Sequence, residues 1–370
     1  MSVLLKKPLF GHVTNKEIAE QLQSKKKCEK KLPIWFNKEK IYFPKPLSIE
    51  QTSSEVTARY KSEIVNGKSL CDLTGGFGVD SYFFSQKVDS VVHCELDPEL
   101  SEIARHNFKV LGATNVQTIS TDGLDYLEQS DEKWDWIYAD PSRRNLTKGK
   151  VVNLEDYSPN IPSNLELLLR KSNKILLKTS PLLDLKIGND QLGFVREIHI
   201  VAVKNEVKEL LWVIEKDFRK EPLIKTINFQ ESKVQQFAFL QSTEKSSESK
   251  LSMPLAFLYE PNAAIMKSGA FKSLTSTYNI FKLHRHTHLY TADRLIEFPG
   301  RIFKIERFIP YSSKSIKSMK VKKANISVRN FPETVARLRA KYKIKDGGDT
   351  YLFFCKTANG KWSTLKCSKV

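Results

Sequence analysis

The chain has 370 residues, more than one ordinary domain needs, so we expect two or three domains. It carries a net charge of +18, and 40% of its residues are hydrophobic. No apolar run reaches the roughly 18 residues of a membrane span and no hydrophobic leader opens the chain, so we expect a soluble, cytoplasmic protein. Five cysteines without a C-x-x-C pair favour neither a disulfide framework nor a zinc site.

The positive charge lies at the two ends of the chain. Residues 1–61 hold 13 Lys and Arg against 6 Asp and Glu, and residues 298–370 hold 18 against 4. The ends therefore carry +7 and +14, and the middle carries −3. Two basic ends favour a polyanionic partner, with nucleic acid first, although a basic surface can also serve only for solubility.

Two helices are predicted before the first strand. Thr14 and Glu17 have the spacing of a capping box, which predicts a short helix after Thr14. A second helix is predicted over residues 53–65, and Asn66-Gly67 should stop it. Its apolar stripe should contain Val56, Tyr60 and Ile64.

A glycine-rich loop follows the first predicted strand, residues 69–74. Three of the four residues from 75 to 78 are glycine, which suits a backbone that turns sharply or approaches a ligand closely. A dinucleotide fingerprint would need a third glycine at Ser81. The carboxylates Asp72 and Asp80 at the two ends of the loop suit an ammonium and a sulfonium better than a pyrophosphate. The loop therefore favours S-adenosylmethionine (SAM) over NAD.

Strands and helices then alternate as far as residue 215. Strands are predicted at residues 90–96, 115–120, 134–140 and 174–179, with helices at 97–110, 123–128 and 163–170. Asp97 and Pro98 should begin the first of these helices as N-cap and first residue. Residues 194–204 and 208–215 are separated by too short a link for a crossover and should form an antiparallel hairpin. This pattern is typical of the seven-stranded class I methyltransferase sheet, a Rossmann-like α/β fold.

After residue 216 the sequence becomes more charged and polar, and its strand and helix signals become shorter. Together with the charge distribution, this suggests four segments. We predict a helical segment at 1–61, the α/β domain at 62–216, a smaller module at 217–297 and a basic domain at 298–370.

Acidic residues also stand at the ends of the second, third and fourth predicted strands, at the sheet edge where open α/β sheets bind ligands. The first two are described here. Glu95, followed by Leu96, is placed to hold ribose hydroxyls. Asp122, followed by Gly123, should lie by the adenine amine. We therefore predict that these residues bind the cofactor together with the loop residues Asp72, Thr74, Gly75, Gly76, Gly78 and Asp80. No metal is expected.

The fourth strand ends in Asp140-Pro141-Ser142-Arg143-Arg144, which resembles the D/N-P-P-Y/F/W motif of methyltransferases that act on exocyclic amines of bases. In that motif the Asp accepts hydrogen bonds from the target amine. Ser142 and Arg143 replace the second proline and the aromatic, which weakens the assignment to base amines. We predict that residues 140–143 are catalytic and that Arg144 contacts substrate.

Two more features could contact substrate. Lys178 ends the fifth strand on the same edge, where it could reach substrate or simply extend to solvent. His284, His286 and His288 would share one face of a strand, but no nearby acid or cysteine completes a metal site, so RNA contact or a structural role is favoured over metal.

Several segments together resemble one family, the bacterial class I SAM-dependent methyltransferases with a C-terminal THUMP-like domain. They are residues 48–55, 72–80, 140–144, 205–211, 288–291, 298–301, 324–332 and 344–352. The resemblance implies a ferredoxin-like module between the two larger domains. It also implies that the segment containing Gln51 and Ser53 closes over the methionine end of SAM. A THUMP-type domain implies structured RNA, which the basic tail with Arg329 and Lys345 independently suits.

The sequence therefore predicts a SAM-dependent methyltransferase that acts on a base nitrogen of tRNA or rRNA. Two alternatives stay open. One is a methyltransferase for a protein or small molecule, and the other is an RNA-binding protein that binds SAM without catalysis. The identity of the RNA, the modified atom and the oligomeric state are not predicted.

Overall fold

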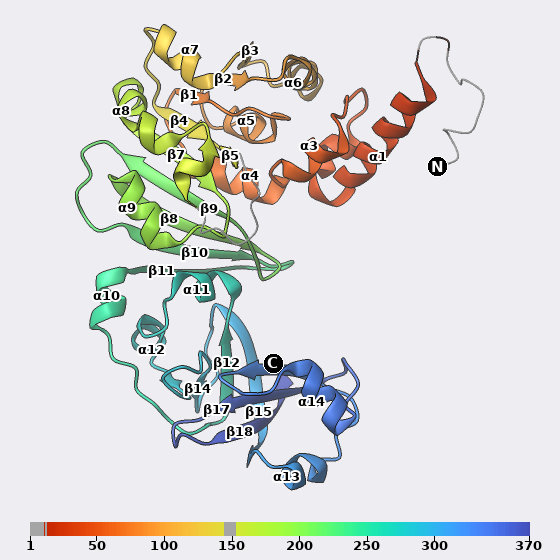
Figure 1. Ribbon diagram of the computed structural model, residues 1–370, viewed down its shortest axis with the longest axis vertical. Helices are drawn as coiled ribbons and strands as arrows, with labels where there is room; N and C mark the ends of the chain where they lie inside the picture. Colours follow the sequence, from red (N-terminus) through yellow and green to blue (C-terminus); the bar gives the residue numbers. More distant parts are fainter. Residues whose placement is uncertain (1–10, 12, 144–152) are drawn as a thin grey trace. The chain divides into compact units, whose positions relative to one another are not determined.

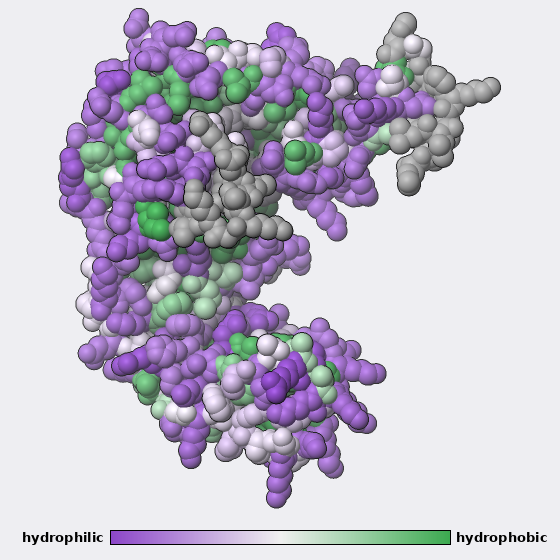
Figure 2. Space-filling model, in the orientation of Figure 1, coloured by the Kyte–Doolittle hydropathy of each residue, from purple (hydrophilic) through white to green (hydrophobic). Residues whose placement is uncertain are grey.

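The structure is a computed structural model that describes residues 11, 13–143 and 153–370. The chain divides into two compact units (Figure 1). Residues 1–197 and 210–220 form the first unit, and residues 198–209 and 221–370 form the second. Among the described residues, no helix combines the length and apolarity needed to cross a bilayer. The face shown in Figure 2 is predominantly hydrophilic.

Four helices precede the first strand: α1 (Asn15–Lys31), α2 (Pro33–Asn37), α3 (Pro46–Gln51) and α4 (Glu55–Ser62). The capping box at Thr14 is confirmed, since the Glu17 backbone N–H donates to Thr14 Oγ1 and the Glu17 carboxylate accepts from the Thr14 backbone N–H. Trp35 anchors this segment on the first unit: it is 1% exposed and its ring contacts those of Phe77 and Phe83.

The helix predicted over residues 53–65 is present as α4, but the predicted buried face is wrong. Val56 is 42% exposed and Tyr60 and Ile64 are half-buried, whereas Thr57, Lys61 and Ser62 are buried beside Ala58. The reason is a buried ion pair of Lys61, described with the candidate site. Polar residues therefore occupy the inward face, where an apolar stripe was expected.

Seven strands form the α/β part of a nine-stranded sheet: β1 (Ser69–Asp72), β2 (Ser90–Glu95), β3 (Val116–Ser120), β4 (Trp136–Ala139), β7 (Lys174–Thr179), β8 (Val195–Val203) and β9 (Glu206–Glu215). Residues 198–209 of the last two strands and their turn are counted with the second unit. The seven strands hydrogen-bond in the order β3-β2-β1-β4-β7-β9-β8. The first five are parallel, and β9 runs antiparallel to β7. This order and the reversed strand confirm the predicted class I methyltransferase sheet.

Five helices connect these strands: α5 (Val79–Phe84), α6 (Pro98–Leu111), α7 (Gly123–Gln129), α8 (Ile161–Lys171) and α9 (Leu185–Leu192). Asp97 caps α6 as predicted, since its carboxylate accepts the Glu99 N–H at 2.9 Å. The chain passes from β1 to β2 towards one edge of the sheet, and from β4 to β7 towards the other edge. Because crossovers between parallel strands are right-handed, α5 and α6 cover one face and α8 covers the other.

Short elements follow β4, where β5 (Ser142–Arg143) pairs with β6 (Tyr157–Ser158). Between them lies a 3-10 turn at Leu154–Asp156.

A two-residue turn joins β8 and β9. Lys204 and Asn205 both have positive φ, 50° and 64°, which is the conformation of a type I′ hairpin turn. The hydrogen-bonded series then continues beyond β8 with β10 (Leu223–Phe229) and β11 (Val234–Leu240). These two strands were not predicted.

The second unit contains another seven-stranded sheet, in the order β13-β14-β12-β15-β18-β17-β16. Its strands are β12 (Phe257–Pro261), β13 (Phe281–Lys282), β14 (Tyr290–Ala292), β15 (Gly300–Pro310), β16 (Asn325–Arg329), β17 (Thr350–Lys356) and β18 (Trp362–Lys369). The helices of this unit are α10 (Gln241–Ser246), α11 (Ala263–Ser268), α12 (Ser273–Tyr278), α13 (Ser313–Ser318) and α14 (Val335–Tyr342). β12 pairs antiparallel with β15, so one sheet runs through the predicted boundary near residue 298.

The three clustered histidines lie in a turn between β13 and β14. His284 Nδ1 accepts the His286 backbone N–H at 3.1 Å, and the His288 ring stacks on Phe271 at 3.6 Å between centroids. In the part of the chain that the structure describes, no group of three or more His, Cys, Asp or Glu could hold a metal ion. All five cysteines are buried and unpaired.

Candidate functional site

Four of the predicted site residues, Asp72, Thr74, Glu95 and Asp140, lie at the carboxyl ends of β1, β2 and β4. β1 and β4 are neighbours, and their crossovers diverge, so the sheet has its switch point between them. Open α/β sheets bind ligands at this position. The Asp140 N–H donates to Thr74 Oγ1 at 2.7 Å and ties the end of β4 to the glycine loop.

The glycine loop has steric reasons for its composition. A Cβ on Gly75 would lie 2.1 Å from the buried His93 ring, so no side chain fits there. Gly76 and Gly78 have φ of 57° and 83°, a conformation that favours glycine. The Gly76 N–H donates to Glu95 Oε2 at 2.7 Å, which attaches the loop to the end of β2.

Asp72 lies beneath the loop and is 1% exposed. Its carboxyl accepts the Thr74 N–H at 3.0 Å and the Ser81 hydroxyl at 2.6 Å. Burial raises the pKa of Asp72 to about 7, although both hydrogen bonds act to lower it. Ser81 Oγ also lies 2.9 Å from His93 Nδ1, and burial lowers the pKa of His93 to about 3, so this imidazole is neutral.

The raised pKa of Asp72 predicts a pH dependence of stability. Between its ordinary pKa of 3.8 and about 7, the folded protein holds a proton that the unfolded chain has released. The stabilisation is therefore complete below this window and is lost as pH rises through it. We expect the free energy of unfolding of the wild type, relative to Asp72→Asn, to fall from about pH 4 to about pH 7. Chemical denaturation across this range measures it, and a constant difference would contradict the assignment.

Asp80 belongs to a buried polar network at the other end of the loop. Its Oδ1 lies 3.2 Å from Nζ of Lys61, a fully buried lysine. Its Oδ2 accepts hydroxyl hydrogen bonds from Ser53 and Tyr138, each at 2.8 Å. Burial alone would raise the pKa of Asp80, but the charges of Lys61 and Lys178 and these hydrogen bonds hold it below its ordinary value.

Sequence reasoning included Ser53 and missed Lys61, Ser81, His93 and Tyr138. The sequence carried no signal for Lys61, because the apolar stripe of its helix predicted a different inward face. The other three lie within ordinary strand and helix patterns.

The remaining predicted cofactor residues lie around this loop. Glu95 also accepts the Asp97 N–H at 2.8 Å, and Leu96 beside it is 70% exposed. Asp122 caps α7 by accepting the Leu124 N–H, and a Cβ on Gly123 would lie 2.5 Å from the Leu73 carbonyl oxygen. Gln51, at the end of α3, is exposed.

Asp140 forms an ion pair with Lys178 on the neighbouring strand β7. Their side chains are 29% and 14% exposed, so the pair lies at the surface of the site and not in the core. Sequence analysis had placed Lys178 near substrate or in solvent. Pro141 is buried, Ser142 is exposed, and the backbone of Ser142 and Arg143 forms β5. Arg144 lies outside the described residues.

The two predicted substrate residues of the tail belong to the second unit. Arg329 lies 2.9 Å from Oε1 of Glu260, a 3%-exposed carboxylate that also pairs with Arg301. Lys345 is exposed and lies beyond α14, which ends at Tyr342.

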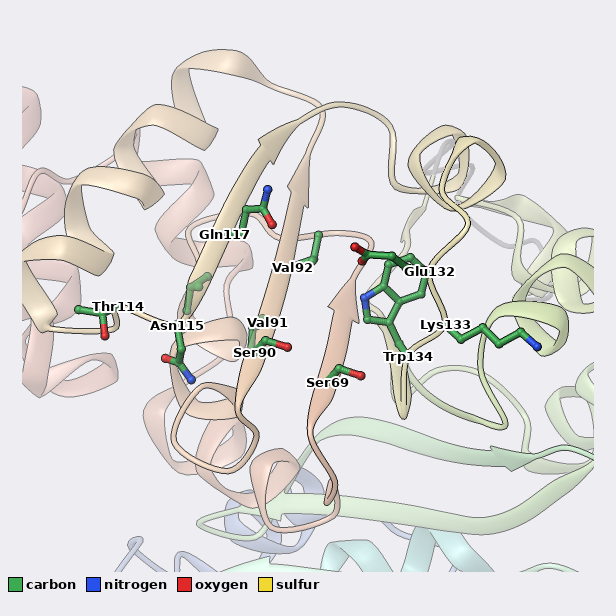
Figure 3. Close-up of a pocket in the computed structure, with 11 residues that line it drawn as sticks. Ser69, Ser90, Val91, Val92, Thr114, Asn115, Gln117, Glu132, Lys133 and Trp134 are labelled. Atoms are coloured by element: carbon green, nitrogen blue, oxygen red, sulfur yellow. The ribbon is translucent and has the colours of Figure 1, made fainter.

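A hollow of about 520 Å³ lies elsewhere on the first unit (Figure 3). Its lining includes Ser69 and Ser90, the first residues of β1 and β2, and Trp134 before β4 (Figure 3). It is therefore at the amino ends of these strands, opposite the end that carries Asp72 and Glu95. The candidate site is the carboxyl edge, because the polar groups described above converge there.

The fold and this edge define a class I methyltransferase-type domain, and comparison with known proteins gives the family. A protein-family model described as a ferredoxin-like domain matches residues 257–299, and one described as a THUMP domain-like matches residues 300–369. A crystal structure from Porphyromonas gingivalis, named a “putative methyltransferase”, is 33% identical with a TM-score of 0.92. The match covers 100% of this chain and 94% of that one. The chain therefore belongs to the family of class I methyltransferase-type proteins with ferredoxin-like and THUMP-like domains.

Other solved structures resemble only part of the chain. An rRNA methylase from Streptococcus thermophilus is 14% identical with a TM-score of 0.33, over 44% of this chain and 94% of that one. A Streptococcus mutans protein in complex with SAH is 13% identical with a TM-score of 0.32, over 44% and 96%. Likenesses this distant support no conclusion about the present chain. No curated protein matches it.

Proposed function

We propose that this protein is a SAM-dependent methyltransferase that modifies an exocyclic amine of a base in a structured RNA such as tRNA or rRNA. The observation that carries the proposal is the position of Asp140. This acid directly follows β4 at the switch point, and its backbone N–H is hydrogen-bonded to the glycine loop.

The charges around the loop support SAM as the cofactor. Among the described residues, Asp72 has hydrogen bonds but no cation beside it, whereas Asp80 is already paired with Lys61. Asp72 is therefore the better candidate for the ammonium group. Glu95 would accept from ribose hydroxyls, exposed Leu96 would cover the adenine, and Asp122 would accept from its amine. When bound, SAM supplies an electrophilic methyl group.

Asp140, which follows β4, would act on the nucleophile. A carboxylate at Asp140 can accept a hydrogen bond from an amine and hold its lone pair in one direction. Positioning of this kind supplies much of the rate in a direct displacement, and the chain forms no covalent bond to the substrate. Lys178 fixes the Asp140 carboxylate through their ion pair.

The RNA part of the proposal depends on the second unit. The THUMP-like segment carries the whole +14 charge of residues 298–370. Lys and Arg side chains bind phosphates and release counterions, so RNA affinity should fall steeply with salt.

Mass spectrometry of RNA nucleosides from a deletion strain and its wild type tests the proposal. A methylated nucleoside missing from the deletion strain, and restored when purified protein and SAM are added to its RNA, would support it. Unchanged RNA together with methyl transfer to protein or a small molecule would favour the first alternative. SAM binding and salt-dependent RNA binding without transfer to any RNA would favour a non-catalytic binding protein.

A further inference from the structure

One tryptophan of this protein lies at the surface. Trp362, the first residue of β18, is 48% exposed. The other four, Trp35, Trp134, Trp136 and Trp212, are each at most 5% exposed. A large aromatic side chain half in solvent leaves apolar area unburied, and tryptophan is enriched at binding interfaces.

The inner side of Trp362 is fixed by neighbouring rings. Its ring centroid lies 6.2 Å from that of Phe331, which lies 4.9 Å from that of Tyr311. The Tyr311 N–H also donates to the Trp362 carbonyl oxygen at 2.9 Å. The indole is therefore held in one place while half of its surface remains open.

Positive charge lies beside this aromatic row. Lys341 on α14 is 5.4 Å from the centroids of both Tyr311 and Tyr342. Lys341 and Arg337 share one carboxylate, Glu333, which is 12% exposed, while Arg337 is 75% exposed. Two cations against one acid leave an excess of positive charge, and exposed Lys361 adds to it.

We infer that Trp362 is a stacking platform for one unpaired base of the RNA, with Arg337, Lys341 and Lys361 contacting the phosphates around that base. The inference rests on the proposed RNA substrate and names where a single-stranded part of it binds. An indole can stack on the flat face of any base, but those faces are covered inside a double helix. The partner is therefore a loop or single-stranded end.

Fluorescence of the full chain tests the inference, because a base stacked on the single exposed indole quenches it. The probe is a single-stranded RNA of about 12 nucleotides, compared with its duplex. We expect the single strand to quench the wild type and not Trp362→Phe. Fluorescence anisotropy should show roughly 5- to 150-fold weaker binding for Trp362→Ala and little loss for Trp362→Phe, which still stacks.

Matched variants separate stacking from general effects. Leu295→Ala removes another exposed apolar residue, which is 53% exposed, and should leave RNA affinity unchanged. Arg337→Ala should weaken binding and reduce its salt slope by about one, whereas Lys233→Ala in the β10–β11 turn should not. Circular dichroism checks that each variant is folded.

Two results would overturn the inference. The first is tight RNA binding without quenching, with equal affinity for wild type and Trp362→Ala. This result would support the RNA substrate but show that no base stacks on Trp362. A dimer that Trp362→Ala dissociates, with unchanged RNA affinity, would assign the indole to a protein contact. If no RNA binds to the wild type at any salt concentration, the proposed RNA substrate fails as well.

Discussion

Replacing Asp140 with alanine should lower kcat for methyl transfer to RNA at least about 100-fold and leave SAM affinity within about twofold of wild type. Alanine removes both carboxylate oxygens, so the target amine loses the acceptor that holds its lone pair in one direction. Transfer of labelled methyl groups to RNA measures kcat, and calorimetry measures SAM binding.

The matched control for this variant is Asp125→Ala, which removes an exposed acid from α7 in the same domain. It should leave both quantities unchanged. Full activity in Asp140→Ala would show that another group orients the substrate. Loss of SAM binding in parallel with activity would instead assign Asp140 to the cofactor.

The replacement Lys61→Met should destabilise the first unit by about 3–5 kcal/mol. Lys61 is fully buried, donates to Ser53 Oγ at 2.9 Å and balances the charge of Asp80. Without it, the Asp80 carboxylate stays buried and loses the cation that lowers its pKa most. Since domains have total stabilities of only about 5–15 kcal/mol, this variant will be close to unfolding at ambient temperature.

Tryptophan fluorescence during denaturation measures this effect, because Trp35, Trp134, Trp136 and Trp212 all lie in the first unit. The control is Lys87→Met, which breaks an exposed pair with Glu63 and should cost less than about 1 kcal/mol. Adding Asp80→Asn to Lys61→Met should recover most of the loss. If the double variant is no more stable than Lys61→Met, the ion pair is not the cause.

The sequence was sufficient to predict the sheet, because its central strands have short apolar runs that end in glycine or acid. It was insufficient for contacts that depend on which strands become neighbours. Lys178 meets Asp140 only because β7 lies beside β4, in a register that pairs Ala139 with Leu177. Likewise, only the folded chain shows that Gly75 is required by the His93 ring.

Periodicity was misleading where a buried charge decides the orientation of an element. On α4 the apolar stripe pointed to Val56, but the ion pair of Lys61 with Asp80 turns another face inward. β10 and β11 were missed for a different reason. Every second residue of β11 is exposed, so the strand lacks the continuous apolar run on which the other predictions relied.

The pairing of β12 with β15 has a consequence for how this protein can be divided. The two sequence families meet between residues 299 and 300, but five residue pairs, from Phe257 with Lys304 to Pro261 with Gly300, join them into one ladder. A recombinant fragment cut at that junction would expose a bare strand edge on each piece, a known route to aggregation. A fragment for isolation should therefore keep β12 and β15 together, although the boundary between the two sequence families separates them.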